Sequence, residues 1–292
     1  MKGLIFAGCS FTWGQGLYYY SDLKRIPTME EWNFDYSLMT DALIGFKDSV
    51  RYPRLVADYF KTFEVCRDTN GGSDEDSLQF IKLALDIENR KPGSFDYLTH
   101  KKFKFEDISY VIFQTTQPYR SSFKFIYKDE TYYMWPNSNR TEMVRICKLN
   151  NAGVYDEIDN PLDIFSDYLN ETNVGVDEWL KQHIDYVYNN IKQTLMLLEE
   201  NGIKTKVLNW EYDYVDMMLV DDFFKDRYVY LEHGNKKYNC ISELFANVPN
   251  TMISKDYEFF GSNPPNDHHP SMFCQKIMSD SIIKSIKSDK LI

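Results

Sequence analysis

The segment of residues 3–17, GLIFAGCSFTWGQGL, constrains the fold of this chain most. It opens with a short apolar run that Gly8 ends, which is the pattern of a buried strand running into a turn. Gly14 and Gly16 then let the backbone turn tightly and approach a ligand closely. Ser10 stands where the strand gives way to the loop, and open α/β folds bind ligands at that edge of the sheet. The segment therefore predicts a central strand that delivers a serine hydroxyl to a ligand site.

A second informative segment lies near the other end of the chain, at residues 262–274, SNPPNDHHPSMFC. It places Asp267, His268 and His269 in a proline-flanked loop before an apolar-periodic tail, and these are two of the five histidines in the chain. A serine nucleophile needs a base, and a neutral imidazole oriented by a carboxylate is suited to that task near neutral pH. The same residues could also form a capped turn, with Ser271 or Asp267 accepting from the first amides of the last helix. The two interpretations are compatible, because a cap would hold the histidine still.

The two blocks GCSFTWGQG and DHHPS resemble the first and last blocks of the SGNH, or GDSL-type, hydrolase superfamily. In that family the nucleophilic serine follows the first strand, and an Asp and a His precede a proline near the C-terminus. The order Ser10, Asp267, His269 matches the order in the family. The resemblance implies an α/β fold of three layers, α/β/α, with a mostly parallel, flavodoxin-like sheet. It also implies that Ser10 attacks an ester carbonyl, with His269 as the base and Asp267 as the residue that orients it.

The second block of the family supplies a glycine amide to the oxyanion hole. The candidate here is RDTNGGSDEDSLQFI, in which Gly71 or Gly72 follows a predicted strand at residues 63–66. Ser73 could cap a helix running over about residues 75–89. Backbone amides at such a turn suit a developing oxyanion because they need no reorganisation. The alternative is that NGG is an ordinary loop.

The third block of the family reads Gly-x-Asn-Asp after the third strand, and the Asn side chain donates to the oxyanion. In this chain the predicted strand YVIFQTT at residues 110–116 is followed by Gln117, which takes the place of that asparagine. A carboxamide that is one methylene longer can still donate a hydrogen bond. Thr115, Thr116 and Arg120 are alternatives for this role or for binding a substrate anion.

The predicted site therefore has three groups of residues. They are Ser10, His269 and Asp267 for catalysis, the amides of Ser10 and Gly72 with the Gln117 side chain for the oxyanion hole, and Gly71, Arg120 and Trp13 for substrate binding.

Two positions depart from the family pattern. Cys9 replaces the Asp of the Gly-Asp-Ser signature, which places a thiol beside Ser10. That thiol could itself be the nucleophile, or it could be a small buried apolar filler. The family also spaces its Asp three residues before the His, and Asn266 occupies that position, whereas Asp267 lies two before His269. Either a tighter turn lets Asp267 orient His269, or the histidine works without an acid.

The chain has 292 residues, of which 43% are apolar, so it can bury a sizeable core as a single domain of residues 1–292. Two insertions are expected, at about residues 18–47 and 119–173, and the second contains a hairpin pattern, FKFIYKDETYYMW. Segments that leave the carboxyl ends of strands belong to the substrate side of such a fold. We therefore predict that both insertions form a lid or cleft wall over the active site.

The remaining elements alternate as a doubly wound fold requires. Residues 176–201 carry an apolar stripe at helical spacing that Gly202 ends. Residues 204–210 then read as a strand, and residues 272–286 as a closing amphipathic helix.

Charge and cysteine usage limit the partners and the compartment. The 33 basic and 44 acidic residues give a net charge of −11, which argues against nucleic acid or an anionic membrane as partner. The five cysteines are widely separated and lack a CxxC motif, which favours a reducing compartment. The first strand begins at once, leaving no room for a signal peptide, and no apolar run has the length of a membrane span. We expect a cytoplasmic protein, including the cytoplasm of a virus-infected cell.

The sequence thus predicts a hydrolase of carboxylic esters without metal or cofactor. A small acyl group on a carbohydrate or another polar scaffold is the expected substrate, because the predicted cleft walls are rich in Tyr and Asn. Two alternatives stay open. The same nucleophile could transfer the acyl group to another alcohol, or the protein could be a binding module that has kept the fold and lost turnover.

Overall fold

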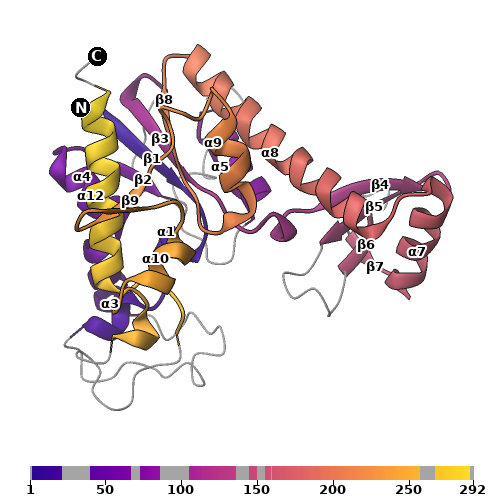
Figure 1. Ribbon diagram of the computed structural model, residues 1–292, viewed down its shortest axis with the longest axis horizontal. Coiled ribbons are helices and arrows are strands. Elements are labelled where there is room, and N and C mark those ends of the chain that lie inside the picture. The colour runs from indigo at the N-terminus through magenta and orange to yellow at the C-terminus, as the bar shows by residue number, and fades with distance from the viewer. Residues whose placement is uncertain are drawn as a thin grey trace.

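The centre of the molecule is a four-stranded parallel sheet in the order β2-β1-β3-β8 (Figure 1). The computed structural model describes residues 2–21, 40–66, 73–85, 105–135, 145–149, 155–158, 160–256 and 267–289. The strands of this sheet are β1 (Gly3–Ala7), β2 (Glu64–Cys66), β3 (Ile108–Gln114) and β8 (Lys204–Leu208). The predicted strands all form, but β3 ends two residues earlier than expected because the Thr116 amide donates to the Asp74 carboxylate instead of continuing the ladder.

Helices cover both faces of this sheet (Figure 1). Leu4 and Phe6 of β1 pack against the helices of one face, and Ile5 and Ala7 pack against those of the other. The covering helices are α4 (Tyr52–Tyr59) and α12 (Met272–Ser288) on the first face, and α5 (Asp74–Leu85) and α8 (Val176–Glu200) on the second. The chain is therefore an α/β protein with a mostly parallel sheet, as predicted. We call this sheet and its covering helices the body.

Shorter elements connect these layers. They are α1 (Ser10–Trp13), η1 (Leu17–Tyr20), α3 (Asp41–Val50), η3 (Phe105–Asp107), η4 (Pro118–Arg120), η5 (Tyr212–Tyr214), α9 (Val215–Val220), the hairpin of β9 (Leu231–His233) and β10 (Lys236–Tyr238), α10 (Ile241–Asn247) and η6 (Ile253–Lys255). The sequence-predicted helix at 75–89 corresponds to α5, whose first turn the Ser73 side chain caps by accepting from the Asp76 amide at 3.1 Å.

The second insertion forms a projecting unit, which we call the arm (Figure 1). Its antiparallel strands are β4 (Phe123–Tyr127), β5 (Glu130–Trp135), β6 (Arg145–Leu149) and β7 (Tyr155–Glu157), and α7 (Pro161–Thr172) packs on them. Phe125, Met134, Ile146 and Phe165 form its own core with Trp179 of α8. For β4 to β7 and α7, the prediction that this insertion walls the active site is therefore wrong, although Arg120 at its start lies on Trp210 near the site. Its apolar face is covered by α7 and α8, and it lies well away from α1.

Helix α8 joins the arm to the body. Its 25 residues span about 37 Å, which is long enough to contribute side chains to the hydrophobic cores of both the arm and the body. Trp179 belongs to the core of the arm, whereas Val187 and Ile191 belong to that of the body. His183 lies between them, with its Nε2 3.0 Å from the Pro118 carbonyl oxygen. Burial lowers the pKa of His183, so this junction holds a neutral imidazole.

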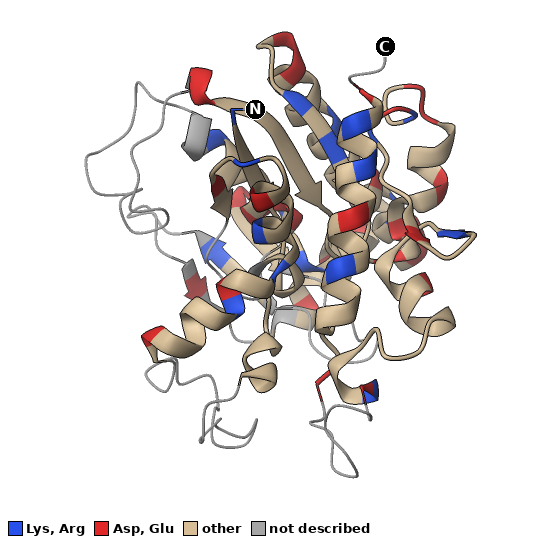
Figure 2. Ribbon diagram, turned by 90° about the vertical axis from the view of Figure 1, so that its left-hand side faces the viewer, with Lys and Arg blue, Asp and Glu red and all other residues tan. Residues whose placement is uncertain are grey.

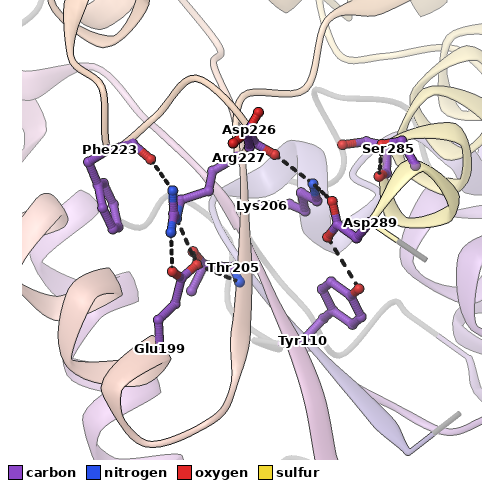
Figure 3. Close-up of polar contacts among 10 residues, drawn as sticks. Tyr110, Glu199, Thr205, Lys206, Phe223, Asp226, Arg227, Ser285 and Asp289 are labelled. Carbon is purple, nitrogen blue, oxygen red and sulfur yellow. Dashed lines mark hydrogen bonds and ion pairs between the residues drawn. The ribbon is translucent and has the colours of Figure 1, made fainter. Parts of the chain in front are cut away.

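Ion pairs tie the helix ends to the amino ends of the strands, opposite the edge that carries Ser10 (Figure 3). The buried Lys206 donates to Asp289 Oδ1 at 2.7 Å, and the Tyr110 hydroxyl donates to Asp289 Oδ2 at 3.2 Å. Beside them Arg227 Nε donates to Glu199 Oε1 at 2.7 Å. A cavity of about 380 Å³ opens here, and the acids and bases that line it neutralise one another. These contacts fix the end of α12 against β3 and β8.

The surface charge is mixed. On the side drawn in Figure 2, basic and acidic residues are interspersed along the helices. The five cysteines are all buried, and none forms a disulfide. None of the helices in the described part of the chain is both long enough and apolar enough to cross a membrane.

Candidate active site

The structure brings Ser10, His269 and Asp267 together from opposite ends of the chain. His269 Nε2 lies 2.8 Å from Ser10 Oγ, and His269 Nδ1 lies 2.6 Å from Asp267 Oδ1. With the proton on Nδ1, the imidazole donates to the carboxylate and can accept the hydroxyl proton of Ser10. The Ser10 residue is 4% exposed and the His269 side chain 20% exposed, so this row of groups is mostly shielded from water.

Local chemistry explains how β1 delivers Ser10. The strand ends at Ala7, and α1 begins at Ser10. A Cβ on Gly8 would lie 2.2 Å from Thr12 Oγ1, so only glycine permits this close approach. Gly14 ends α1 at a φ of 85°, in the left-handed region that favours glycine. As the first helical residue, Ser10 has an amide that the helix itself does not use, and that amide is available to an oxyanion.

A buried polar network holds the turn of α1 against its surroundings. Thr12 Oγ1 donates to Gln114 Oε1 at 2.8 Å, and Gln114 Nε2 donates to Cys9 Sγ at 3.1 Å. Because the Thr12 proton is committed to Gln114, the Tyr52 hydroxyl donates to Thr12 Oγ1 at 2.8 Å. All four side chains are buried, so their hydrogen bonds restrict them to one arrangement.

Gln275 of α12 extends this network to the helix that follows His269. Its Oε1 accepts from the Tyr52 amide at 2.8 Å, and its Nε2 donates to the Phe11 carbonyl at 3.3 Å. One buried carboxamide thus ties α12 to the residue next to Ser10. This contact holds the helix that follows His269 against the helix that begins at Ser10.

The loop that carries His269 is fixed by backbone pairing. The Ile253 amide donates to the His269 carbonyl at 2.9 Å, and the Ser254 amide donates to the Asp267 carbonyl at 2.8 Å. Ser271 then caps α12, which was one of the sequence expectations for this segment. The cap lies two residues after His269 in the same stretch, so the capping interpretation is confirmed, and it is compatible with His269 acting as a base.

Asp267 can orient the His269 ring although it lies only two residues before it, because one carboxylate oxygen accepts from both the backbone amide and the ring of His269. Asp267 Oδ1 accepts from the His269 amide at 2.9 Å as well as from the ring at 2.6 Å. Its other oxygen faces Gly16, where a Cβ would lie only 2.6 Å from Oδ2. Burial, and then the negative charge of Asp267, raise the pKa of Tyr19 to about 12. The described start of the first insertion therefore lies against the acid.

Cys9 has a different environment from Ser10. It is fully buried, and burial raises its pKa, so the thiolate that would act as a nucleophile is disfavoured. Its sulfur accepts from Gln114, whereas His269 contacts Ser10. The geometry favours Ser10 over Cys9 as the nucleophile.

An aromatic row leads from the imidazole to Arg120. The Phe11 ring meets His269 edge-on with centroids 5.3 Å apart, and its centroid lies 4.5 Å from that of Trp210. The Arg120 guanidinium carbon lies 4.5 Å above the centroid of the Trp210 ring. Phe11 holds the imidazole in place, and the row presents a cation near the nucleophile.

Asp74 is a buried carboxyl behind this row. It accepts from the Thr116 amide at 2.6 Å and from the Tyr214 hydroxyl at 2.9 Å. Burial raises its pKa to about 7, and these two donors and the charge of Arg120 oppose that rise. Asp74 therefore anchors the loop after β3 to α5.

The other predicted site residues have varied positions. Gln117 precedes η4. Burial raises the pKa of the Glu211 carboxyl, and the Gln117 side chain lowers it. Trp13 is the last residue of α1. Gly71 and Gly72 lie outside the described residues, so the second oxyanion amide stays a prediction.

Three residues near the site were not predicted from the sequence. Gln114 is the one amide in an otherwise apolar strand, and this polar interruption could have drawn attention to it. Asp74 is one of three acidic residues in the first turn of α5, and nothing in the sequence distinguishes it from Glu75 and Asp76. Trp210 follows β8 with no local signal of its position beside Phe11.

The comparisons with known proteins assign no family. No family model matches the chain, and neither a curated protein nor a solved structure matches it significantly.

Proposed function

We propose that this chain is a serine hydrolase of the SGNH type that cleaves a carboxylic ester. The observation that carries the proposal is the pair of contacts His269 Nε2 to Ser10 Oγ at 2.8 Å and His269 Nδ1 to Asp267 Oδ1 at 2.6 Å. A hydroxyl, an imidazole and a carboxylate in this order are the arrangement that activates serine for acyl transfer.

In the proposed reaction, Ser10 Oγ attacks the ester carbonyl carbon while His269 Nε2 takes the hydroxyl proton. The resulting imidazolium is stabilised by Asp267 and then protonates the leaving alcohol. Water, deprotonated by His269, releases the acid from Ser10. The Ser10 amide stabilises the oxyanion, and Gly72 and Gln117 are the further proposed donors, each contributing about 3 kcal/mol.

The fold supports the SGNH assignment within the proposal. The nucleophile follows the first strand of a mostly parallel sheet, and the acid and base precede the last helix. Residues 251–254 and the Gln275 side chain hold that helix and its preceding loop against α1. The altered third block leaves Gln117 with a carboxamide near Glu211, so its role as donor is the part of the proposal that rests on the sequence alone.

The proposed substrate is a small acyl ester on a carbohydrate or other polar scaffold. The Tyr- and Asn-rich second insertion no longer supports this choice, because it forms the arm. The first insertion still does, since its start at Tyr18–Tyr20 lies beside Asp267. Phe11 and Trp210 add aromatic surface next to the imidazole.

The test is to treat the purified chain with a fluorophosphonate and to map the adduct by mass spectrometry, alongside turnover of p-nitrophenyl and acetylated-sugar esters. We expect an adduct on Ser10 and ester hydrolysis that Ser10→Ala abolishes. Cys9→Ala is the matched control at the neighbouring position, and it should keep both labelling and turnover. Adding an alcohol acceptor and identifying the product separates hydrolysis from acyl transfer.

Labelling of Cys9 alone, or hydrolysis that persists while Ser10 stays unlabelled, would overturn the proposal. A folded protein that neither labels nor turns over any ester would instead support the alternative of a binding module.

A further inference from the structure

Arg120 is a cation at the ligand edge of the sheet. It ends η4, which directly follows β3, and its guanidinium lies 4.5 Å above the Trp210 ring. Ser10 follows β1, and β1 and β3 are neighbours in the sheet. The strand order reverses at β1, because β2 lies on one side of it and β3 on the other. Open α/β sheets bind ligands in the crevice at such a reversal, so Ser10 and Arg120 flank the same crevice.

The guanidinium has no hydrogen bond or ion pair in the described part of the chain. An arginine presents five donors in a planar fork, and stacking on Trp210 leaves the edges of that fork open. A carboxylate can accept two parallel N–H bonds from such a fork, so the edges that Trp210 leaves open are suited to a substrate carboxylate.

Among the described residues, Cys9, Asp74 and Glu211 have pKa values that burial raises and the charge of Arg120 lowers. Burial is the larger effect in all three. Asp74 and Glu211 are the carboxyls whose charge Arg120 interacts with. Two neighbouring carboxyls would still repel a dianion more than a monoanion, which favours a carboxylate over a phosphate.

We infer that Arg120 binds a carboxylate of the substrate, so that the esters cleaved at Ser10 carry a free carboxylate on their acyl or alcohol part. The inference rests on the proposed function and narrows its substrate class. The Trp210 stack fixes the guanidinium, and the substrate carboxylate accepts two of its N–H groups. The ester carbonyl is thereby held in register with Ser10 Oγ.

The experiment compares two matched ester pairs. For the acyl side the pair is mono-4-nitrophenyl succinate and its methyl ester, and for the alcohol side it is 4-acetoxybenzoate and its methyl ester. The measured quantity is the ratio of kcat/KM for the anionic over the neutral member of a pair. We expect a ratio of roughly tenfold to a hundredfold in one pair, the size of a charge-assisted hydrogen bond.

Arg120→Met should bring that ratio to about one, because the carboxylate of the anionic ester loses its partner while the neutral ester never had one, so the ratio reports this contact whatever happens to the activity on the neutral ester. Arg120→Lys keeps the charge without the planar fork and should retain part of the preference. Arg54→Met is the matched control. Arg54 lies on α4, where it is paired with Asp58 of the same helix and with Glu64 of β2, so its replacement should leave the ratio unchanged. Two fluorophosphonates, one with a carboxylate tail and one with its methyl ester, give the same ratio without turnover.

A wild-type protein without preference in either pair and with either probe would overturn the inference, as would a preference that survives Arg120→Met. In both cases hydrolysis of the neutral esters would leave the proposed function standing. If no ester is cleaved and neither probe labels Ser10, the proposed function fails, and this inference fails with it.

Discussion

The body and the arm are built on two sheets that bury their residues differently. Every residue of β1 is buried, because helices cover both faces of the parallel sheet. Strand β4 of the arm alternates instead, and its Ile126 is 66% exposed. The arm therefore buries one face only, against α7 and the start of α8.

The body and the arm also differ in that the candidate active site lies in the body alone, as far as the described residues show. Ser10, His269 and Asp267 all belong to segments of the body that meet at one edge of its sheet. None of the described residues of the arm contacts them in the set of hydrogen bonds and ring contacts at the site. Catalysis and the core of the arm should thus be separable. Four measurements follow: three concern residues of the body, and the last one, in the arm, tests the separation directly.

The largest effect is expected at the base. His269→Ala should lower kcat/KM by about 10⁴-fold or more, because Ser10 loses the group that takes its proton. His268→Ala is the control within the same loop. The His268 ring only approaches Ser254 Oγ at 3.4 Å, so most activity should remain. The opposite ranking of the two variants would reassign the base.

Asp267→Asn should lower kcat by about a hundredfold or more. The carboxamide favours the wrong tautomer of His269 and does not stabilise the imidazolium. Kinetics at saturating ester, together with a melting temperature, measure this. A loss smaller than about threefold at an unchanged melting temperature would show that Ser10 and His269 act as a dyad.

The next effect concerns stability and pH at Asp74. Its pKa of about 7 in the folded protein exceeds its ordinary value of 3.8, so the folded state holds the proton more tightly than the unfolded state does. The contribution of Asp74 to the free energy of unfolding therefore falls as pH rises from about 4 to about 7, and the full cost is present above that range. Asp74→Asn stays neutral and should remove this decline.

Urea unfolding at pH 5 and pH 8 measures the effect. Between pH 5 and pH 8, the free energy of unfolding of the variant should fall by about 1 to 4 kcal/mol less than that of the wild type. Its Oδ1 can still accept from the Thr116 amide, so the loop after β3 keeps its anchor. Parallel pH dependence in the two proteins would show that Asp74 is ionised throughout.

The smallest effect on turnover is expected from the arm. Phe125→Ala should destabilise the core of the arm by about 3 to 5 kcal/mol through the cavity it leaves. Activity on a small ester should change by less than about twofold. Hydrogen exchange should show faster exchange for amides of β4 to β6 and unchanged protection in β1 and β3. Phe113→Ala in β3 is the matched control, and it should lower both protection in the body and turnover. Activity that falls in step with the stability of the arm would refute the separation.

Local sequence patterns were enough to predict much of the body. The apolar run before Gly8, the stripe of α8 and the helix after His269 depend on residues close together in the chain. The pairing of Ser10 with His269 was also predicted, although it joins two ends of the chain. The predicted parallel sheet explains why: it collects the segments that follow its strands at one edge.

The sequence did not predict features that depend on packing between segments far apart in the chain. The role of Gln114, which lies against Cys9 and Thr12, was not predicted, and the assignment of Gln117 as an oxyanion donor stays a prediction. The second insertion was expected over the site because of where it leaves the sheet. Its direction is set by burial of the apolar residues of β4 to β6 and α7 against Trp179 at the start of α8.

The sequence by itself determined the α/β type of fold, the turn that carries Ser10 and the loop that carries His269, because glycine geometry and apolar periodicity act over a few residues. Only the tertiary structure decided that Asp267 closes a two-residue turn onto His269, and that Arg120 lies on Trp210, which contacts Phe11. Those contacts depend on side-chain directions across elements that are far apart in the chain. Their geometry is fixed only when the core is packed and the buried hydrogen bonds are made.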